Sequence, residues 1–344
     1  MKLSEHESTG RTLIIAEIAQ AHDGSLGILH SLVDAVASTG VDAIKFQVHI
    51  ADAESSAIEP FRVRFSPIDA TRFDYWRRME LSLAEWRVLK KRCEVHGIEF
   101  LATPFSNAAV DLLEEVGVQR YKIGSGDAAN QLLLERVART GKEVILSTGL
   151  GSLDELDVAT ALLRSRGNPF AVLQCTTRYP TAPEDVGLAW LTSFRERYGC
   201  PVGLSDHSGT IYAGLGAVAL GAVAVEAHVT FDRRMFGPDA KASLTVDEFA
   251  SLVDGIRFME KARTLGPDKS LDDNKRELRR MFGKSLAVNS DLPAGHVMTF
   301  EDLEGKKPAD AGIEVSSYIG IIGKKLKTHK KRGDFLSHED INID

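Results

Sequence analysis

Short apolar runs alternate with amphipathic segments along most of the chain. Val, Ile and Phe are frequent in these runs, which match strands that are covered on both faces, as parallel strands are. The predicted strands are residues 13–18, 43–48, 99–105, 120–125, 143–149, 170–176, 201–207 and 222–231.

An amphipathic segment with helical spacing follows each predicted strand. The predicted helices are residues 27–39, 82–96, 107–116, 130–140, 153–166, 187–198, 212–220 and 246–263. Several are followed by glycine, which readily adopts the left-handed conformation after a helix. These repeated units predict an α/β fold, a TIM (β/α)8 barrel. A doubly wound open sheet is the alternative, but no GxGxxG motif follows the first strand, which argues against its dinucleotide-binding form.

The alternating pattern ends near residue 265, where a charged segment begins. We therefore predict a barrel domain at 1–266, a linker at 267–283 and a small domain at 284–344. The small domain contains a weak repeat, in which Gly295, Thr299 and Asp302 recur as Gly333, Ser337 and Asp340. In both copies a hydroxyl residue precedes an aspartate by three positions, which favours a capped helical turn.

Composition excludes several classes of protein. Apolar residues make up 43% and charged residues 26% of the 344-residue chain, an ordinary globular balance. The net charge of −7 argues against a nucleic-acid partner. No apolar run has the length of a membrane span, and the first residues are polar, so we expect no membrane association and a cytoplasmic location. Three widely spaced cysteines form no CxxC pair and predict buried, reduced thiols.

Polar and charged residues stand at the carboxyl ends of most predicted strands, where barrel enzymes hold their active sites. Lys45 and Lys122, with Ser125, Ser147 and Ser205 as neutral donors, are suited to a phosphate group. Each lysine alone also fits an internal ion pair. A lysine on a barrel strand also fits Schiff-base chemistry, and this possibility stays open.

His207 and His228 end adjacent predicted strands. Two imidazoles there suit one divalent ion in an open, catalytic site, although a lone barrel histidine is more often a hydrogen-bonded structural residue. Glu17 is a candidate general base or member of the metal's ligand shell. Asp127 and Asp239 are candidates for binding sugar hydroxyl groups.

Taken in order, the strand ends resemble the N-acetylneuraminate (sialic acid) synthase family over nearly the whole chain. The small domain resembles the family's antifreeze-like (SAF) domain. The segments that carry the resemblance are residues 14–18, 44–47, 102–105, 121–127, 146–149, 179–181, 203–208 and 237–243.

The resemblance implies a TIM barrel whose SAF domain is swapped between the two subunits of a homodimer. It implies that phosphoenolpyruvate condenses with the aldehyde of an N-acetylmannosamine-like amino sugar, giving a 2-keto-3-deoxy sugar acid and phosphate. It implies Mn²⁺ or Mg²⁺ on His207 and His228. The positions matching the phosphoenolpyruvate site are Lys45, Thr103, Lys122, Ser125, Ser147 and Ser205. The positions matching the metal and sugar region are Glu17, Gln47, Asp127, Tyr179 and Asp239.

Three departures from the family pattern concern the sugar acceptor. Ala21 and Thr177 each stand where the family has Asn, and Lys307 stands where it has an arginine that reaches the sugar. Lysine cannot reproduce the planar guanidinium fork. We therefore expect an unusual acceptor, with legionaminic-type, pseudaminic-type and non-acetylated sugars all open. The competing hypotheses are an aldolase that uses free pyruvate, and a sugar-binding protein on an inactive barrel.

Overall fold

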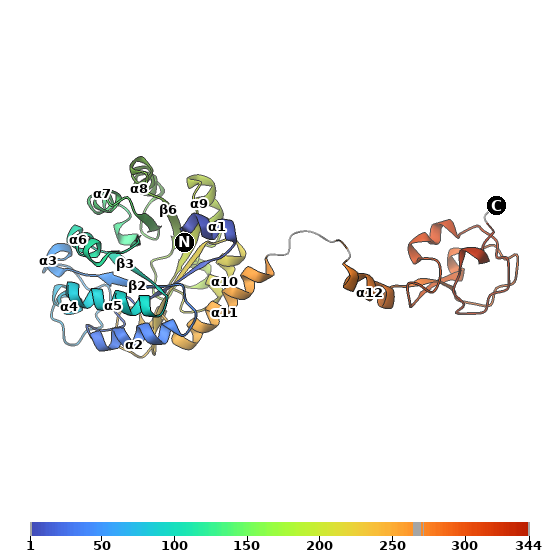
Figure 1. Ribbon diagram of the computed structural model, residues 1–344, viewed down its shortest axis with the longest axis horizontal. Coiled ribbons are helices and arrows are strands. Elements are labelled where there is room, and N and C mark those ends of the chain that lie inside the picture. The colour runs from blue at the N-terminus through green and yellow to red at the C-terminus, as the bar shows by residue number, and fades with distance from the viewer. Residues whose placement is uncertain (1, 264–269, 271, 343–344) are drawn as a thin grey trace. The chain divides into compact units, whose positions relative to one another are not determined.

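A computed structural model describes residues 2–263, 270 and 272–342 (Figure 1). Eight parallel strands pair in sequence order, and β1 also pairs with β8, so the sheet closes into the predicted barrel. A two-residue strand, β9 (Leu244–Thr245), pairs in parallel with the end of β8. The barrel strands are β1 (Leu13–Glu17), β2 (Ala43–Val48), β3 (Glu99–Pro104), β4 (Arg120–Ile123), β5 (Glu143–Ser147), β6 (Phe170–Cys175), β7 (Val202–Asp206) and β8 (Ala224–Thr230).

Helices pack around the barrel (Figure 1). The helices that follow the strands are α2 (Leu26–Ala37), α5 (Leu83–Val95), α6 (Asn107–Val116), α7 (Gln131–Ala138), α8 (Leu153–Arg166), α9 (Trp190–Tyr198), α10 (Tyr212–Ala219) and α11 (Val246–Ala262). Most differ from the predicted ranges at one end or both because the prediction included flanking residues. Ser82, for example, lies outside α5 and accepts a hydrogen bond from the Glu85 backbone, as an N-cap does.

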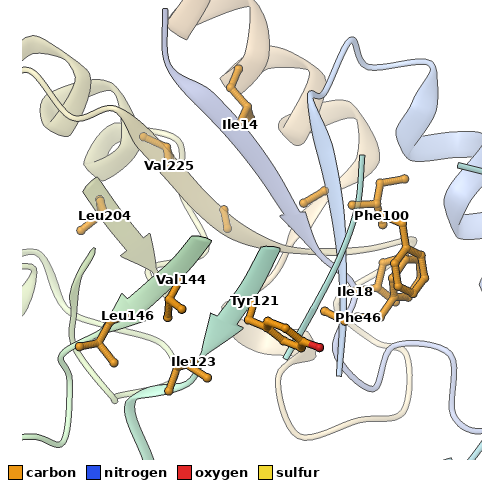
Figure 2. Close-up of a cluster of buried hydrophobic side chains, with 14 of the residues drawn as sticks. Ile14, Ile18, Phe46, Phe100, Tyr121, Ile123, Val144, Leu146, Leu204 and Val225 are labelled. Carbon is orange, nitrogen blue, oxygen red and sulfur yellow. The ribbon is translucent and has the colours of Figure 1, made fainter. Parts of the chain in front are cut away.

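The barrel strands are buried on both faces, as their composition predicted. Their outward side chains form one large cluster with the surrounding helices, part of which Figure 2 shows around Phe46, Phe100 and Tyr121. A second, smaller cluster lies inside the barrel and includes Leu13 and Ile15 of β1. Side chains on a strand alternate between the two faces, so β1 supplies both clusters.

Three helices of the first unit were not predicted. Helix α1 (Leu3–Thr9) precedes β1, and its Leu3 side chain joins the cluster inside the barrel. Helices α3 (Ala51–Glu54) and α4 (Arg72–Met79) lie between β2 and α5, where the gap between the predicted strand 43–48 and the predicted helix 82–96 indicated only a long loop. None of the helices among the described residues is long and apolar enough to cross a membrane.

Contacts divide the chain into two compact units, Met1–Leu265 and Gly266–Asp344. The boundary predicted at residue 266 lies outside the described residues. Helix α12 (Asp273–Phe282) occupies much of the segment predicted as a linker. The second unit pairs β10 (Ser285–Val288) with β11 (Leu303–Lys306) over a small core of its own.

The predicted repeat appears as two similar capped turns in the second unit. The 3-10 helices η4 (Phe300–Asp302) and η6 (His338–Asp340) are preceded by Thr299 and Ser337. Each hydroxyl donates to an aspartate carboxylate, Asp302 or Asp340, at 2.8 Å. The spacing of hydroxyl and aspartate therefore marks the same local structure twice.

Candidate active site

A cavity of about 440 Å³ lies at the carboxyl end of the barrel strands. Every predicted site residue of the barrel lines it: Glu17, Lys45, Gln47, Thr103, Lys122, Ser125, Asp127, Ser147, Tyr179, Ser205, His207, His228 and Asp239. Of the departures from the family pattern, Thr177 also lines the cavity, whereas Ala21 does not. Lys307 belongs to the second unit, where its ammonium group lies 5.1 Å from the centre of the Phe282 ring.

Four buried charged groups meet at the bottom of this cavity. Lys45 Nζ lies 3.0 Å from Glu17 Oε2 and 3.5 Å from Glu226 Oε1. Lys122 Nζ lies 3.4 Å from the same Glu226 oxygen. Both lysines thus have internal carboxylate partners, the alternative that the sequence left open for each one. With all four groups ionised, the cluster is electrically neutral.

The two carboxylates of this cluster differ in protonation. Burial raises the pKa of Glu17 to about 7, because the attraction of Lys45 only partly offsets the loss of hydration. Burial also opposes ionisation of Glu226, but the charges of Lys122 and Lys45 outweigh it and hold the pKa of Glu226 at about 2. Glu226 is therefore an anion near neutral pH, whereas Glu17 titrates in that range.

Hydroxyl groups surround the lysines. Lys45 Nζ donates to Thr103 Oγ1 at 3.2 Å, and Lys122 Nζ donates to Ser147 Oγ at 2.7 Å. Ser205 donates to Glu226 at 2.9 Å. The hydroxyls lie at strand ends or just after them because the strands are parallel and all finish at the same rim of the barrel.

His207 and His228 lie side by side, with ring centres 5.2 Å apart. Burial lowers the pKa of each to about 3, so both rings are neutral. The carbonyl of Thr176 lies 2.9 Å from His207 Nδ1 and can only accept a hydrogen bond. The proton is therefore on Nδ1, and Nε2 carries a lone pair, which faces the Tyr179 hydroxyl at 3.1 Å.

The chemistry of these two imidazoles fits a divalent ion. Both rings are neutral, and a carbonyl fixes the tautomer of His207, as is usual for metal-binding histidines. Among the described residues no His228 hydrogen bond is found, and no group of three or more His, Cys, Asp or Glu side chains is arranged to hold a metal. Water or a bound substrate would have to supply the remaining ligands.

The segment between β2 and α5 forms part of the cavity wall. Its Arg62 pairs with Asp239 at 2.5 Å, and its guanidinium lies 4.1 Å from the centre of the Tyr179 ring. Tyr75 and Trp76, which belong to α4 of the same segment, are buried. This part of the wall thus combines buried aromatic side chains with the charged pair of Arg62 and Asp239.

Several residues of the cavity had no role predicted from the sequence. Glu226 lies two positions before His228 on β8, so the alternation of side chains places both inside the barrel. That spacing was the signal for Glu226. Arg62 and Glu54 lie in the predicted loop, where no periodic pattern indicates which side chains turn toward the cavity.

Comparisons with known proteins agree with this geometry. The model of the NeuB family matches residues 32–268. The N,N'-diacetyllegionaminic acid synthase of Campylobacter jejuni is 33% identical to the chain, over 95% of the chain and 99% of that protein. The human N-acetylneuraminate-9-phosphate synthase is 32% identical, over 95% of the chain and 91% of that protein.

A solved structure shows the same likeness. The N-acetylneuraminic acid synthetase of Leptospira borgpetersenii, in complex with citrate, is 31% identical with a TM-score of 0.68. The match covers 78% of this chain and 90% of that one. Family model, relatives and fold agree, and the chain therefore belongs to the NeuB family.

Proposed function

We propose that the protein condenses phosphoenolpyruvate with the open-chain aldehyde of an amino sugar. The products are a 2-keto-3-deoxy sugar acid and inorganic phosphate. In this reaction the enol carbon of phosphoenolpyruvate forms a bond to the aldehyde carbon, and water adds to the neighbouring carbon. The carbon–oxygen bond to phosphate then breaks, so phosphate leaves with its bridging oxygen.

The observation that carries the proposal is the buried cluster of two lysines and two carboxylates. With Glu17 protonated, Lys45, Lys122 and Glu226 leave a net charge of +1 at the bottom of the cavity. Buried positive charge surrounded by hydroxyl donors stabilises a phosphate or carboxylate anion. Thr103, Ser125, Ser147 and Ser205 supply the neutral donors. The raised pKa of Glu17 supports this arrangement near neutral pH.

We propose that His207 and His228 hold Mn²⁺ or Mg²⁺ next to the aldehyde. A bound divalent ion would supply Lewis-acid polarisation of the aldehyde carbonyl. Tyr179 and Asp239 line the sugar side of the same histidines. Replacing either histidine by Ala should lower the bound metal per chain, measured by elemental analysis, and should leave the thermal unfolding midpoint close to that of the wild type.

We propose that the acceptor lies against Gln47, Asp127, Tyr179, Asp239 and the segment between β2 and α5. The relatives carry different products in their names, a diacetylated legionaminic acid in one and a neuraminic acid 9-phosphate in another. The acceptor side therefore varies within the family. Arg62, Thr177 and Lys307 are the residues of this chain that we assign to acceptor choice.

We further propose that the protein works as a homodimer in which residues 284–344 form an SAF domain that serves the barrel of the partner. Lys307 would then contact the acceptor sugar. The sequence resemblance of this region to a swapped domain supports the proposal. Lysine presents three donors on a flexible stem, which suits a carboxylate or hydroxyl groups better than a planar amide.

The test is release of inorganic phosphate from phosphoenolpyruvate with Mn²⁺ and a panel of amino hexoses, acetylated and free. We expect release with at least one sugar and none without it. With ¹⁸O in the bridging position, the label should leave with phosphate. Label retained in the keto acid would contradict carbon–oxygen cleavage.

A covalent aldolase is the second candidate because burial lowers the pKa of Lys122, a property that a Schiff-base lysine needs. Borohydride treatment in the presence of pyruvate distinguishes the two. The proposed reaction predicts no trapped adduct and a strict need for phosphoenolpyruvate. An adduct that disappears in Lys122→Ala would favour the aldolase.

A further inference from the structure

We propose that Glu54 and His49 are positioning residues that orient the Gln47 amide toward Glu17 through Gln20. The role of Glu54 and His49 goes beyond the residues assigned above. Its functional part rests on the proposed condensation reaction. Its structural part is the order of hydrogen-bond donors along the chain of side chains, which is independent of the reaction.

The five side chains form a continuous series of hydrogen bonds. Glu54 Oε1 lies 2.7 Å from His49 Nδ1, and His49 Nε2 lies 3.0 Å from Gln20 Nε2. Gln20 Nε2 also donates to Gln47 Oε1 at 2.5 Å, and His49 Nε2 itself lies 3.3 Å from the same Gln47 oxygen. Gln47 Nε2 donates to Glu17 Oε1 at 2.6 Å. The series therefore runs from helix α3 to the lysine cluster.

The Glu54 carboxylate at one end of the series determines the arrangement of donors. The Glu54 carboxylate only accepts, so His49 carries a proton on Nδ1, and a neutral ring then accepts at Nε2. Gln20 must then present its NH₂ group to His49, and the same group donates to Gln47. Gln47 is left with its own NH₂ group facing Glu17. The orientation of the Gln47 amide thus follows from the Glu54 end of the series.

Packing holds the middle of the series in place. The His49 ring is stacked between Trp76 and Phe105, with ring centres 4.0 and 4.6 Å away. Gln20 and His49 are only 4% and 5% exposed, so water cannot replace the hydrogen bonds at low cost. The residue before Gln20, Ala19, has φ of 46°, a region that alanine rarely adopts.

The orientation matters because of what Glu17 contacts with its other oxygen. Glu17 Oε1 accepts from Gln47, whereas Oε2 lies 3.0 Å from Lys45 Nζ. If Gln47 were reversed, two oxygens would face each other and push the Glu17 carboxylate away from its place beside Lys45. A carboxylate on α3 thereby influences the geometry of the lysine cluster through His49, Gln20 and Gln47.

The substitution Glu54→Gln tests this directly. A glutamine can donate to His49 Nδ1, which would move the imidazole proton to Nε2 and reverse both amides. Nitrogen-15 NMR of histidine-labelled protein reports the tautomer, with the His49 signals assigned by their loss in His49→Gln. We expect a proton on Nδ1 in the wild type and on Nε2 in Glu54→Gln. A wild-type ring protonated on Nε2, or on both nitrogens, would overturn the proposal whether or not the protein is active.

Kinetics separate positioning from general stability. Glu54→Gln should lower kcat by about tenfold, the effect of one misplaced hydrogen bond to a charged group, with little change in KM for phosphoenolpyruvate. Glu54→Asp should restore part of the loss. In a double-mutant cycle, Glu54→Gln should cost almost nothing once Gln47 is Ala, because its effect passes through Gln47.

The matched control is Asp52→Asn on the same helix. Its side chain is 73% exposed and pairs with Arg77 outside the series. It should show no coupling to Gln47. Full additivity of Glu54→Gln and Gln47→Ala in an active enzyme would reject the positioning role alone. A wild type that releases no phosphate with any sugar would instead reject the condensation reaction, and the NMR result would still decide the donor order.

Discussion

Glu226 holds together two lysines that would otherwise repel each other inside the barrel. Its Oε1 lies within 3.5 Å of both ammonium groups and also accepts from Ser205. A phosphate or carboxylate group of a substrate would compete for the same two cations. Glu226 therefore determines how strongly a bound anion must compete for the two lysines.

The substitution Glu226→Gln should destabilise the free protein by about 3–5 kcal/mol, since it leaves buried lysines without their shared partner. Phosphoenolpyruvate should then raise the thermal unfolding midpoint more in this variant than in the wild type, because it supplies the missing negative charge. Glu115→Gln is the control: its side chain is 62% exposed and should change stability by no more than about 0.5 kcal/mol. Equal midpoint shifts for Glu226→Gln and wild type would contradict a shared anion site.

The raised pKa of Glu17 predicts how the activity depends on pH. Its pKa is raised by burial to about 7, so the carboxyl group is protonated below that pH and ionised above it. If the ionised form acts as the base toward the sugar, kcat/KM for the acceptor should rise with pH through a value near 7. In Glu17→Gln, the residual kcat/KM should no longer rise with pH near 7. If kcat/KM rises with pH in that variant as it does in the wild type, another group is responsible for the titration.

At the level of elements, α1 shows how a short helix can add a side chain to the core inside the barrel. Leu3 is 1% exposed and packs with the side chains inside the barrel. The backbone N–H of Leu3 donates to Glu143 Oε1 at 2.9 Å, which anchors the helix to the start of β5. A single apolar residue in a polar segment was the only signal in the sequence, and it was too weak to predict a helix.

Leu3→Ala should lower the free energy of unfolding by about 2–5 kcal/mol, the usual loss for a buried leucine. Urea unfolding measures this. Glu7→Ala, on the exposed side of the same helix, should change the free energy of unfolding by no more than about 0.5 kcal/mol. Similar losses in both variants would mean that α1 acts through its helical structure and not through the buried leucine.

The segment between β2 and α5 is the element for which the sequence was least informative. Its helices α3 and α4 are short, and Phe65, Tyr75 and Trp76 pack against one another within it. Phe65 also contacts Phe236, which follows β8. Such contacts depend on packing against distant strands and leave no period in the sequence. For the same reason Arg62, His49 and Glu54 were not recognised as residues of the cavity.

At the level of the whole molecule, the swapped homodimer remains a prediction from sequence. It predicts that two inactive chains complement each other. One chain carries Lys307→Ala and the other His207→Ala, and neither should be active alone. Mixed dimers contain one site that combines an intact barrel with an intact SAF domain, so refolding the two together should restore part of the phosphate release.

Two results would contradict the swapped arrangement. One is a monomer in solution by analytical ultracentrifugation. The other is a chain truncated after Arg280 that keeps full activity and acceptor preference. The matched control for complementation is a mixture of His207→Ala with His228→Ala, two changes in the same barrel, which should stay inactive in every combination.

The sequence by itself determined the barrel and the ring of polar residues at its rim. Strand and helix patterns are local, and parallel strands that end in Lys45, Lys122, His207 and His228 bring these residues to one rim in any closed arrangement. Thirteen candidate residues of the barrel line one cavity for this reason.

Only the tertiary structure decided which of these groups are paired and in which protonation state. Glu226 neutralises both lysines, Glu17 loses hydration, and His207 receives its tautomer from the Thr176 carbonyl. Each effect depends on distances of a few ångströms between strands and loops that are far apart in the chain. Electrostatic and hydrogen-bond energies change steeply over such distances. Hydrophobic burial, which specifies the barrel, is non-directional and changes little over them.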